Sequence, residues 1–95
     1  MYLHLGQETL VDEKNIIGLF DLDTSTLSAK TREFLARAEK SGQVVNVSAE
    51  LPKSFVITGQ RLKPQTVYIS QLTTGTLKKR SEEGVKSLSG EQAGL

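Results

Sequence analysis

Only one stretch of this chain has the apolar periodicity of an amphipathic helix, and this limits the fold more than any other feature. The stretch spans residues 27–41, and its apolar side is formed by Leu27, Thr31, Phe34, Leu35 and Ala38. Thr26 or Ser28 can cap the first amides of the helix, and Gly42 stands where a left-handed C-terminal residue is favoured. We therefore predict one helix over residues 27–41, packed through a single side.

The rest of the folded region consists of short runs rich in β-branched and aromatic residues, separated by polar or glycine-containing turns. These runs predict strands at 1–5, 9–11, 16–22, 44–48, 54–58 and 66–70. The last two are joined by the loop 59–65 and predict an antiparallel hairpin. The run 16–22, "IIGLFDL", is the most apolar, which predicts a central strand. The fold class that follows is α+β, a small and mostly antiparallel sheet of about six strands with one amphipathic helix on one face.

The length of 95 residues and the change in composition after residue 80 define the domain organisation. We expect a single domain over residues 1–80, in which 72–80 adds a short capped helical turn weakened by Gly75. The Ser-, Glu- and Gly-rich segment 81–95 predicts a mobile C-terminal tail. One helix leaves apolar sheet surface uncovered, so we also expect a homo-oligomer with strands 1–5 and 16–22 near the contact.

The composition argues against several classes of site. The chain has no cysteine and only one histidine, His4, which is expected on the surface of the first strand. We therefore expect no disulfide, no metal site and no bound cofactor. No apolar run approaches the ~18 residues of a membrane span, and no signal-peptide pattern opens the chain. These features favour a cytoplasmic protein without membrane contact.

The motif Asp21-x-Asp23 at the end of an apolar run resembles the aspartate pair of haloacid-dehalogenase-like phosphotransferases. That chemistry also needs a second acidic cluster to hold magnesium. Residues 51–81 contain neither Asp nor Glu, although such a cluster would have to lie there. We therefore interpret the two aspartates as ordinary exposed side chains and predict that the protein is not an enzyme.

The net charge of +1 hides a strong asymmetry along the chain. Residues 1–52 carry −3, residues 53–80 carry +6 without any acid, and residues 81–95 carry −2. The six basic residues of the middle segment are Lys53, Arg61, Lys63, Lys78, Lys79 and Arg80. Such a basic segment is typical of a protein that binds an anionic partner. It is equally typical of a lysine-rich edge strand that resists aggregation.

The order "MYLHLG", "IIGLFDLD", "TREFLARAEKSG", "KSFVIT", "VYIS" and "TLKKR" resembles RemB-like proteins of the extracellular matrix regulator family. The resemblance covers residues 1 to about 80. It implies a small bacterial cytoplasmic regulator related to the RemA proteins, which bind DNA, form rings and activate biofilm matrix genes. The resemblance also implies that "FDLD" closes a sheet strand and performs no phosphoryl chemistry.

The DNA-binding arginines of the RemA proteins are not found at the matching positions of this chain. Asn15 stands where those proteins carry an arginine, and Leu51 and Pro52 stand at a paired-arginine position, although Lys14 and Lys53 are adjacent. Two hypotheses remain. In the first, the protein binds the phosphate backbone of double-stranded DNA through the six basic residues of segment 53–80. In the second, it is a regulatory oligomer that binds a protein partner. The first hypothesis expects those basic residues to share one face of the protein, whereas their scattering would favour the second.

Overall fold

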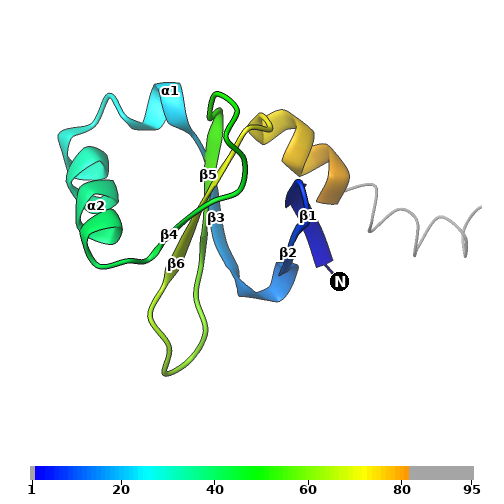
Figure 1. Cartoon of the computed structure of the whole chain (residues 1–95), viewed down its shortest axis with the longest axis horizontal. Coiled ribbons are helices and arrows are strands. Elements are labelled where there is room, and N and C mark those ends of the chain that lie inside the picture. The colour runs from blue at the N-terminus through cyan, green and yellow to red at the C-terminus, as the bar shows by residue number, and fades with distance from the viewer. Residues whose placement is uncertain (1, 82–95) are drawn as a thin grey trace, which may run out of the picture.

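The computed structural model of the protein describes residues 2–81, which form an α+β fold with its strands in two sheets (Figure 1). The elements are, in chain order, β1 (Tyr2–Gly6), β2 (Thr9–Asp12), the 3-10 turn η1 (Glu13–Asn15), β3 (Ile16–Asp21), α1 (Leu22–Ser25), α2 (Ala29–Lys40), β4 (Val44–Asn46), β5 (Ser54–Thr58) and β6 (Thr66–Ser70). Residues 74–81 form a further helical segment. The predicted α+β class is confirmed. The tail expected at 81–95 lies outside the described residues, except for Ser81.

The main sheet has four strands in the order β3-β5-β6-β4. The pairs β3–β5 and β5–β6 are antiparallel, whereas β4 pairs with β6 in parallel. The predicted hairpin is confirmed with its expected bounds, 54–58 and 66–70. The prediction of a central strand at 16–22 is wrong, because β3 is an edge strand. Its apolar character arises because Ile16 and Leu19 pack on one side of the sheet while Phe20 stacks on Phe55 on the other side.

Helix α2 covers one face of the main sheet (Figure 1). Its side chains Phe34, Leu35 and Ala38 pack against Phe55 and Val67 of the central strands. The helix ends as predicted, with Gly42 in the left-handed region at φ +72°. Its beginning differs, because the chain first forms the separate turn α1. Leu27 therefore lies before α2 and is 79% exposed instead of joining the apolar side.

The two-stranded ribbon β1–β2 and the helical segment 74–81 cover the opposite face of the sheet (Figure 1). This second core consists of Leu3, Leu5, Val11, Val47, Val56 and Leu77, all of them at most 8% exposed. The second face is thus not bare, and the premise for the expected homo-oligomer does not hold. Apolar side chains remain exposed elsewhere, among them Ile17 on the edge strand β3, at 59%.

Two fully buried serines tie the sheet to the segments that cover this second face. The Ser70 hydroxyl donates to the Leu5 carbonyl at 2.6 Å and accepts from the Leu72 amide at 3.0 Å. The Ser54 hydroxyl donates to the Leu72 carbonyl at 2.7 Å. Buried polar groups of this kind are satisfied only in one arrangement of the chain, so they fix the ribbon relative to the sheet.

Candidate functional site

The two aspartates at the end of β3 have a structural explanation. The Asp21 carboxylate caps α1, accepting from the Thr24 amide at 3.0 Å and from its hydroxyl at 2.8 Å. These hydrogen bonds favour the charged form and hold the pKa of Asp21 below its ordinary value. Asp23 is exposed in the first turn of α1. Within residues 2–81, no group of three or more acidic or histidine side chains is arranged to hold a metal ion.

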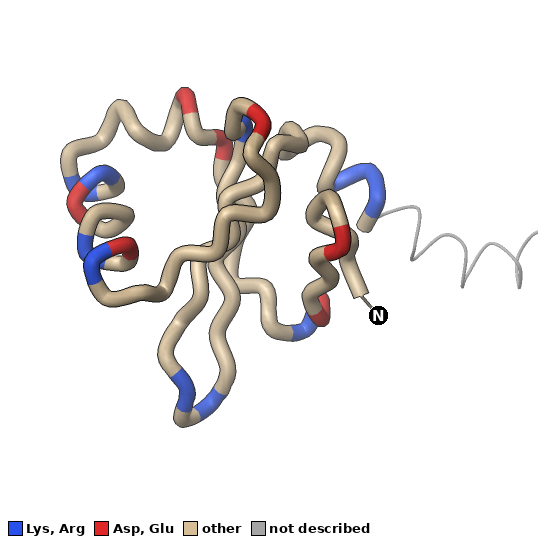
Figure 2. The backbone as a smooth tube through the Cα atoms, in the orientation of Figure 1, with Lys and Arg blue, Asp and Glu red and all other residues tan. Residues whose placement is uncertain are grey.

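The six basic residues of segment 53–80 lie at three separate places (Figure 2). Arg61 and Lys63 lie on the loop between β5 and β6, Lys53 precedes β5, and Lys78, Lys79 and Arg80 lie on the helical segment after β6. The structure therefore brings Arg61 and Lys63 together but does not gather the six residues into one continuous patch.

The loop 59–65, termed here the hairpin loop, extends beyond the end of the main sheet (Figure 1). Arg61, Leu62 and Lys63 are all exposed at its tip, and Leu62 is 95% exposed. The Lys63 amide donates to the Gln60 carbonyl at 3.1 Å, which closes the turn. Leu62 adopts a left-handed backbone at φ +66°, a costly conformation for a bulky residue that often marks a functional loop. Two cations and an apolar side chain thus project together into solvent.

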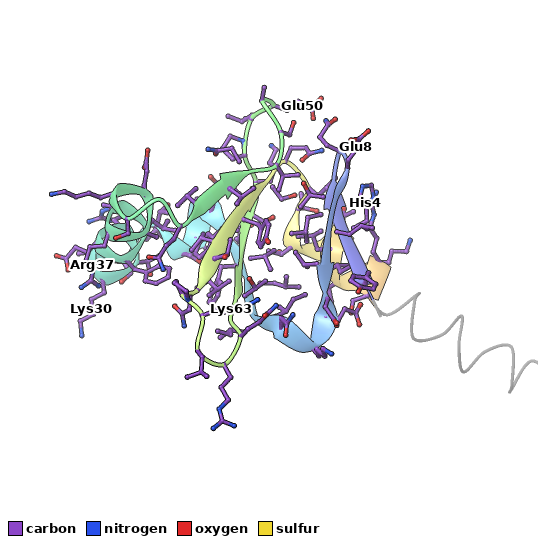
Figure 3. All side chains as sticks on the ribbon, turned by 60° about the horizontal axis from the view of Figure 1, so that its bottom comes forward. His4, Glu8, Lys30, Arg37, Glu50 and Lys63 are labelled. Atoms are coloured by element: carbon purple, nitrogen blue, oxygen red, sulfur yellow. The ribbon has the colours of Figure 1, made fainter. Side chains whose placement is uncertain are left out.

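The opposite end of the sheet is acidic. Lys53 lies there, because its carbonyl accepts from the Leu22 amide at 3.0 Å, beside the Asp21 cap. The five residues of β5 separate Lys53 from the hairpin loop, and the six extended steps from Lys53 to Gly59 span about 20 Å. Figure 3 shows Glu8 and Glu50 near each other at this end and Lys63 at the other. Both glutamates line one shallow concavity of about 620 Å³.

The helical segment 74–81 holds Arg80 against the ribbon. Thr73 caps it, since its side-chain oxygen accepts from the Thr76 amide at 3.2 Å. Leu77 is fully buried and anchors the segment in the core. Arg80 contacts His4 of β1 at two atoms, the carbonyl oxygen at 3.3 Å and Nδ1 at 3.4 Å. His4 is exposed, as expected, and its Nε2 donates to the Gln7 carbonyl. Arg80 is thus engaged within the chain.

Arg61 also faces an open concavity of about 720 Å³ at the base of the hairpin loop. Lys14 and Asn15 line the same concavity from η1. The Gly59 amide donates to the Asn15 carbonyl at 2.8 Å, which fixes the base of the loop against η1. Lys14 and Asn15 stand at or beside an arginine position of the RemA proteins, and their proximity to Arg61 was not predicted from the sequence. The antiparallel pairing of β3 with β5, in which Ile16 lies opposite Thr58, brings these residues together.

The chain is similar to known regulatory proteins over nearly all of its described part. Residues 2–80 match the RemA-like family, described as extracellular matrix regulatory protein A-like. Extracellular matrix regulatory protein B of Bacillus subtilis (strain 168) is 38% identical over 82 residues, which are 86% of this chain and 91% of that protein. None of the described helices is long and apolar enough to cross a membrane.

Proposed function

The chain belongs to the RemA-like family of extracellular matrix regulatory proteins, and we propose that it is a cytoplasmic bacterial regulator that binds double-stranded DNA at genes of the biofilm matrix. The observation that carries this proposal is the hairpin loop, which projects Arg61 and Lys63 from the end of the sheet. Cations on a projecting loop reach the phosphate backbone without a groove or a recognition helix.

The distribution of charge supports an approach of DNA from the hairpin-loop end. That end carries Arg61 and Lys63 without an acid between residues 59 and 65, whereas the opposite end carries Glu8, Glu50 and Asp21. A polyanion is attracted to the first end and repelled by the second. Lys53, which lies at the acidic end, is therefore assigned a minor part in binding. Lys78 and Lys79 on the helical segment provide a second basic patch beside the ribbon.

Two adjacent cations give weak binding, so the proposal includes a homo-oligomer that presents several hairpin loops to one duplex. Linked weak contacts gain affinity through effective concentration. The free edge of β3 is the proposed contact between copies, because no described strand pairs with that edge and Ile17 on it is 59% exposed. Sedimentation at micromolar concentration tests this part of the proposal, and a monomer at that concentration would contradict it.

The binding experiment is fluorescence anisotropy with a labelled DNA duplex at two salt concentrations. Each subunit is expected to neutralise ~2–4 phosphates, and the logarithmic salt slope is about 0.9 per contact. The double variant Arg61→Ala/Lys63→Ala should bind all duplex sequences more weakly and with a flatter slope. The matched control is Lys30→Ala/Arg37→Ala on α2, which removes the same charge from a region away from Lys63 (Figure 3). Equal losses in both variants would show that the binding face is wrongly placed.

A protein partner is the second candidate, and the exposed side chain of Leu62 favours it. A leucine that is 95% exposed between two cations offers one apolar side chain and two charges to a partner with an apolar pocket and an acidic rim. The dispersal of the six basic residues over three places also favours this candidate. If the affinity for DNA is weaker than millimolar at low salt and neither double variant changes it, binding of a protein partner becomes the favoured function.

A further inference from the structure

Both tyrosines of the chain line the concavity at the base of the hairpin loop. Tyr2 comes from the ribbon strand β1, and Tyr68 comes from the sheet strand β6. The ring of Tyr68 is half-buried, while Tyr2 is 66% exposed. The volume of about 720 Å³ lies within the range of small-molecule sites. The two layers of the molecule thus bring both phenol rings of the chain to one ligand-sized concavity.

The concavity also gathers polar groups that have no partner among the described residues. These are the Tyr68 hydroxyl, the Asn15 amide and the Arg61 guanidinium, none of which makes a hydrogen bond or an ion pair with another residue of 2–81. The backbone of Asn15 is held by the bond from the Gly59 amide to its main-chain carbonyl. A side-chain amide, a hydroxyl and a guanidinium around one space are the groups by which proteins orient a small polar ligand.

The charge of the concavity comes from Arg61. Asp12 and Lys14 also line it, but Asp12 already accepts from the Lys14 amide at 3.1 Å, and its second oxygen lies 3.6 Å from the Lys14 ammonium. These contacts neutralise the carboxylate locally, although the pair is exposed and therefore weak. One unpaired guanidinium remains, which matches a single phosphate group through two parallel hydrogen bonds.

We propose that this concavity binds a nucleoside monophosphate. The base packs against the tyrosine rings, as bases stack on aromatic side chains in proteins that bind single-stranded nucleic acids. The Asn15 amide reads the edge of the base, a pairing that amides make readily with adenine. Arg61 holds the phosphate. Since Arg61 is shared with the proposed DNA contact, the bound nucleotide competes with DNA, and only this competition rests on the proposed function.

The test uses the full chain labelled with 3-fluorotyrosine, which gives two ¹⁹F resonances because Tyr2 and Tyr68 are the tyrosines of the sequence. The variant Tyr2→Phe assigns them. Adenosine 5′-monophosphate is titrated beside adenosine and ribose 5-phosphate at matched ionic strength. We expect both resonances to shift saturably with the nucleotide, and each half-ligand to bind at least about tenfold more weakly. No shift with the nucleotide, or equal affinity for ribose 5-phosphate, would overturn the proposal.

The variants Arg61→Ala and Lys63→Ala provide the matched comparison, since both remove one cation from the hairpin loop but only Arg61 lines the concavity. Arg61→Ala should weaken nucleotide binding about tenfold or more, whereas Lys63→Ala should leave it unchanged. Equal losses of nucleotide binding in the two variants would show that the nucleotide is attracted to the basic loop without entering the concavity, and would also overturn the proposal.

The two proposals fail in different ways. Shifts of the tyrosine resonances in a protein that does not bind duplex DNA would support the nucleotide site and contradict the proposed function. DNA binding by a protein whose tyrosine resonances do not respond to the nucleotide would do the reverse. Where both bind, the nucleotide should lower the anisotropy of bound DNA more than ribose 5-phosphate does at the same concentration. An equal effect of the two would contradict the competition.

Discussion

The two faces of the main sheet are covered in different ways. On the ribbon face, the core joins residues from both ends of the described chain, among them Leu3 and Leu77, and its members are nearly inaccessible to solvent. On the α2 face, Ala38 is the buried residue of the helix, while Phe34 and Leu35 remain half-exposed. The ribbon face is thus closed by distant segments, and the α2 face by a helix that packs through a shallow contact.

This difference indicates where the stability of the protein resides. Fully buried large side chains contribute about 1.5–3 kcal/mol each from burial alone, and half-exposed ones contribute proportionally less. The serine hydrogen bonds also lie on the ribbon face and add a geometric constraint that the α2 face lacks. The ribbon face should therefore dominate the free energy of unfolding, and four variants test this.

The largest effect is expected for Leu77→Ala. Leu77 is fully buried in the ribbon-face core, so its truncation removes buried methyl groups and leaves a cavity. We expect a loss of about 3–4 kcal/mol in the free energy of unfolding, measured by urea denaturation. The matched variant is Leu35→Ala on α2, whose side chain packs on the sheet but is half-exposed, so the expected loss in the free energy of unfolding is about 1–2 kcal/mol. Equal losses would break the comparison between the two faces.

The next largest effect is expected for Ser70→Ala. The change leaves the buried Leu5 carbonyl without its donor and removes the acceptor of the Leu72 amide. Unsatisfied buried groups cost about 1–3 kcal/mol each, so the midpoint of urea unfolding should fall clearly. Ser41→Ala, at the exposed C-terminal end of α2, is the control and should change the midpoint little. A loss no larger than that of the control would show that the ribbon is not fixed by this hydroxyl.

A smaller effect is expected for Asp21→Ala, which removes the cap of α1 and so loosens Leu22 on the α2 face. The hydrogen bonds from Thr24 lower the pKa of Asp21 in the folded protein. The charged carboxylate therefore stabilises the fold above its unfolded pKa, near 3.8, and this contribution is lost as the pH falls through the lower folded value. The difference in Tm between wild type and variant should be full at neutral pH and shrink below pH 3.8. A difference independent of pH would contradict the assigned role of the carboxylate.

The smallest effect on stability is expected for Arg61→Ala/Lys63→Ala, because the hairpin loop belongs to neither core. Exposed charges on a loop contribute little to folding, so the free energy of unfolding should stay within about 0.5 kcal/mol of wild type. Thermal and urea unfolding measure this directly. A larger loss would mean that the loop supports the sheet, and reduced DNA binding by this variant would then need correction for unfolded protein.

Local sequence patterns predicted the elements better than their arrangement. The hairpin 54–58 and 66–70 and the apolar side of α2 followed from residue periodicity, which depends on neighbouring residues alone. The edge position of β3 and the parallel pairing of β4 with β6 depend on contacts between distant segments. An apolar strand looks alike at the centre of a sheet and at an edge that is packed on both faces, so periodicity could not distinguish them.

The candidate site was predictable in part for the same reason. Charge counting identified the hairpin loop with Arg61 and Lys63, because both residues lie in one short segment. The meeting of Tyr2 and Tyr68 could not be foreseen, because it requires the ribbon to dock on the sheet. The scatter of Lys53 and the helical-segment cations likewise follows from their places at different ends of the fold.

The conformation of the hairpin loop also has a consequence for proteolysis. A projecting tip with an exposed backbone is the kind of segment that a protease can bind and cut without unfolding the domain. Trypsin cleaves after Arg and Lys but not before proline, so the Arg61–Leu62 bond is open to it while Pro64 shields the bond after Lys63. Brief digestion should therefore cut the hairpin once, and the two pieces would stay together through the pairing of β5 with β6.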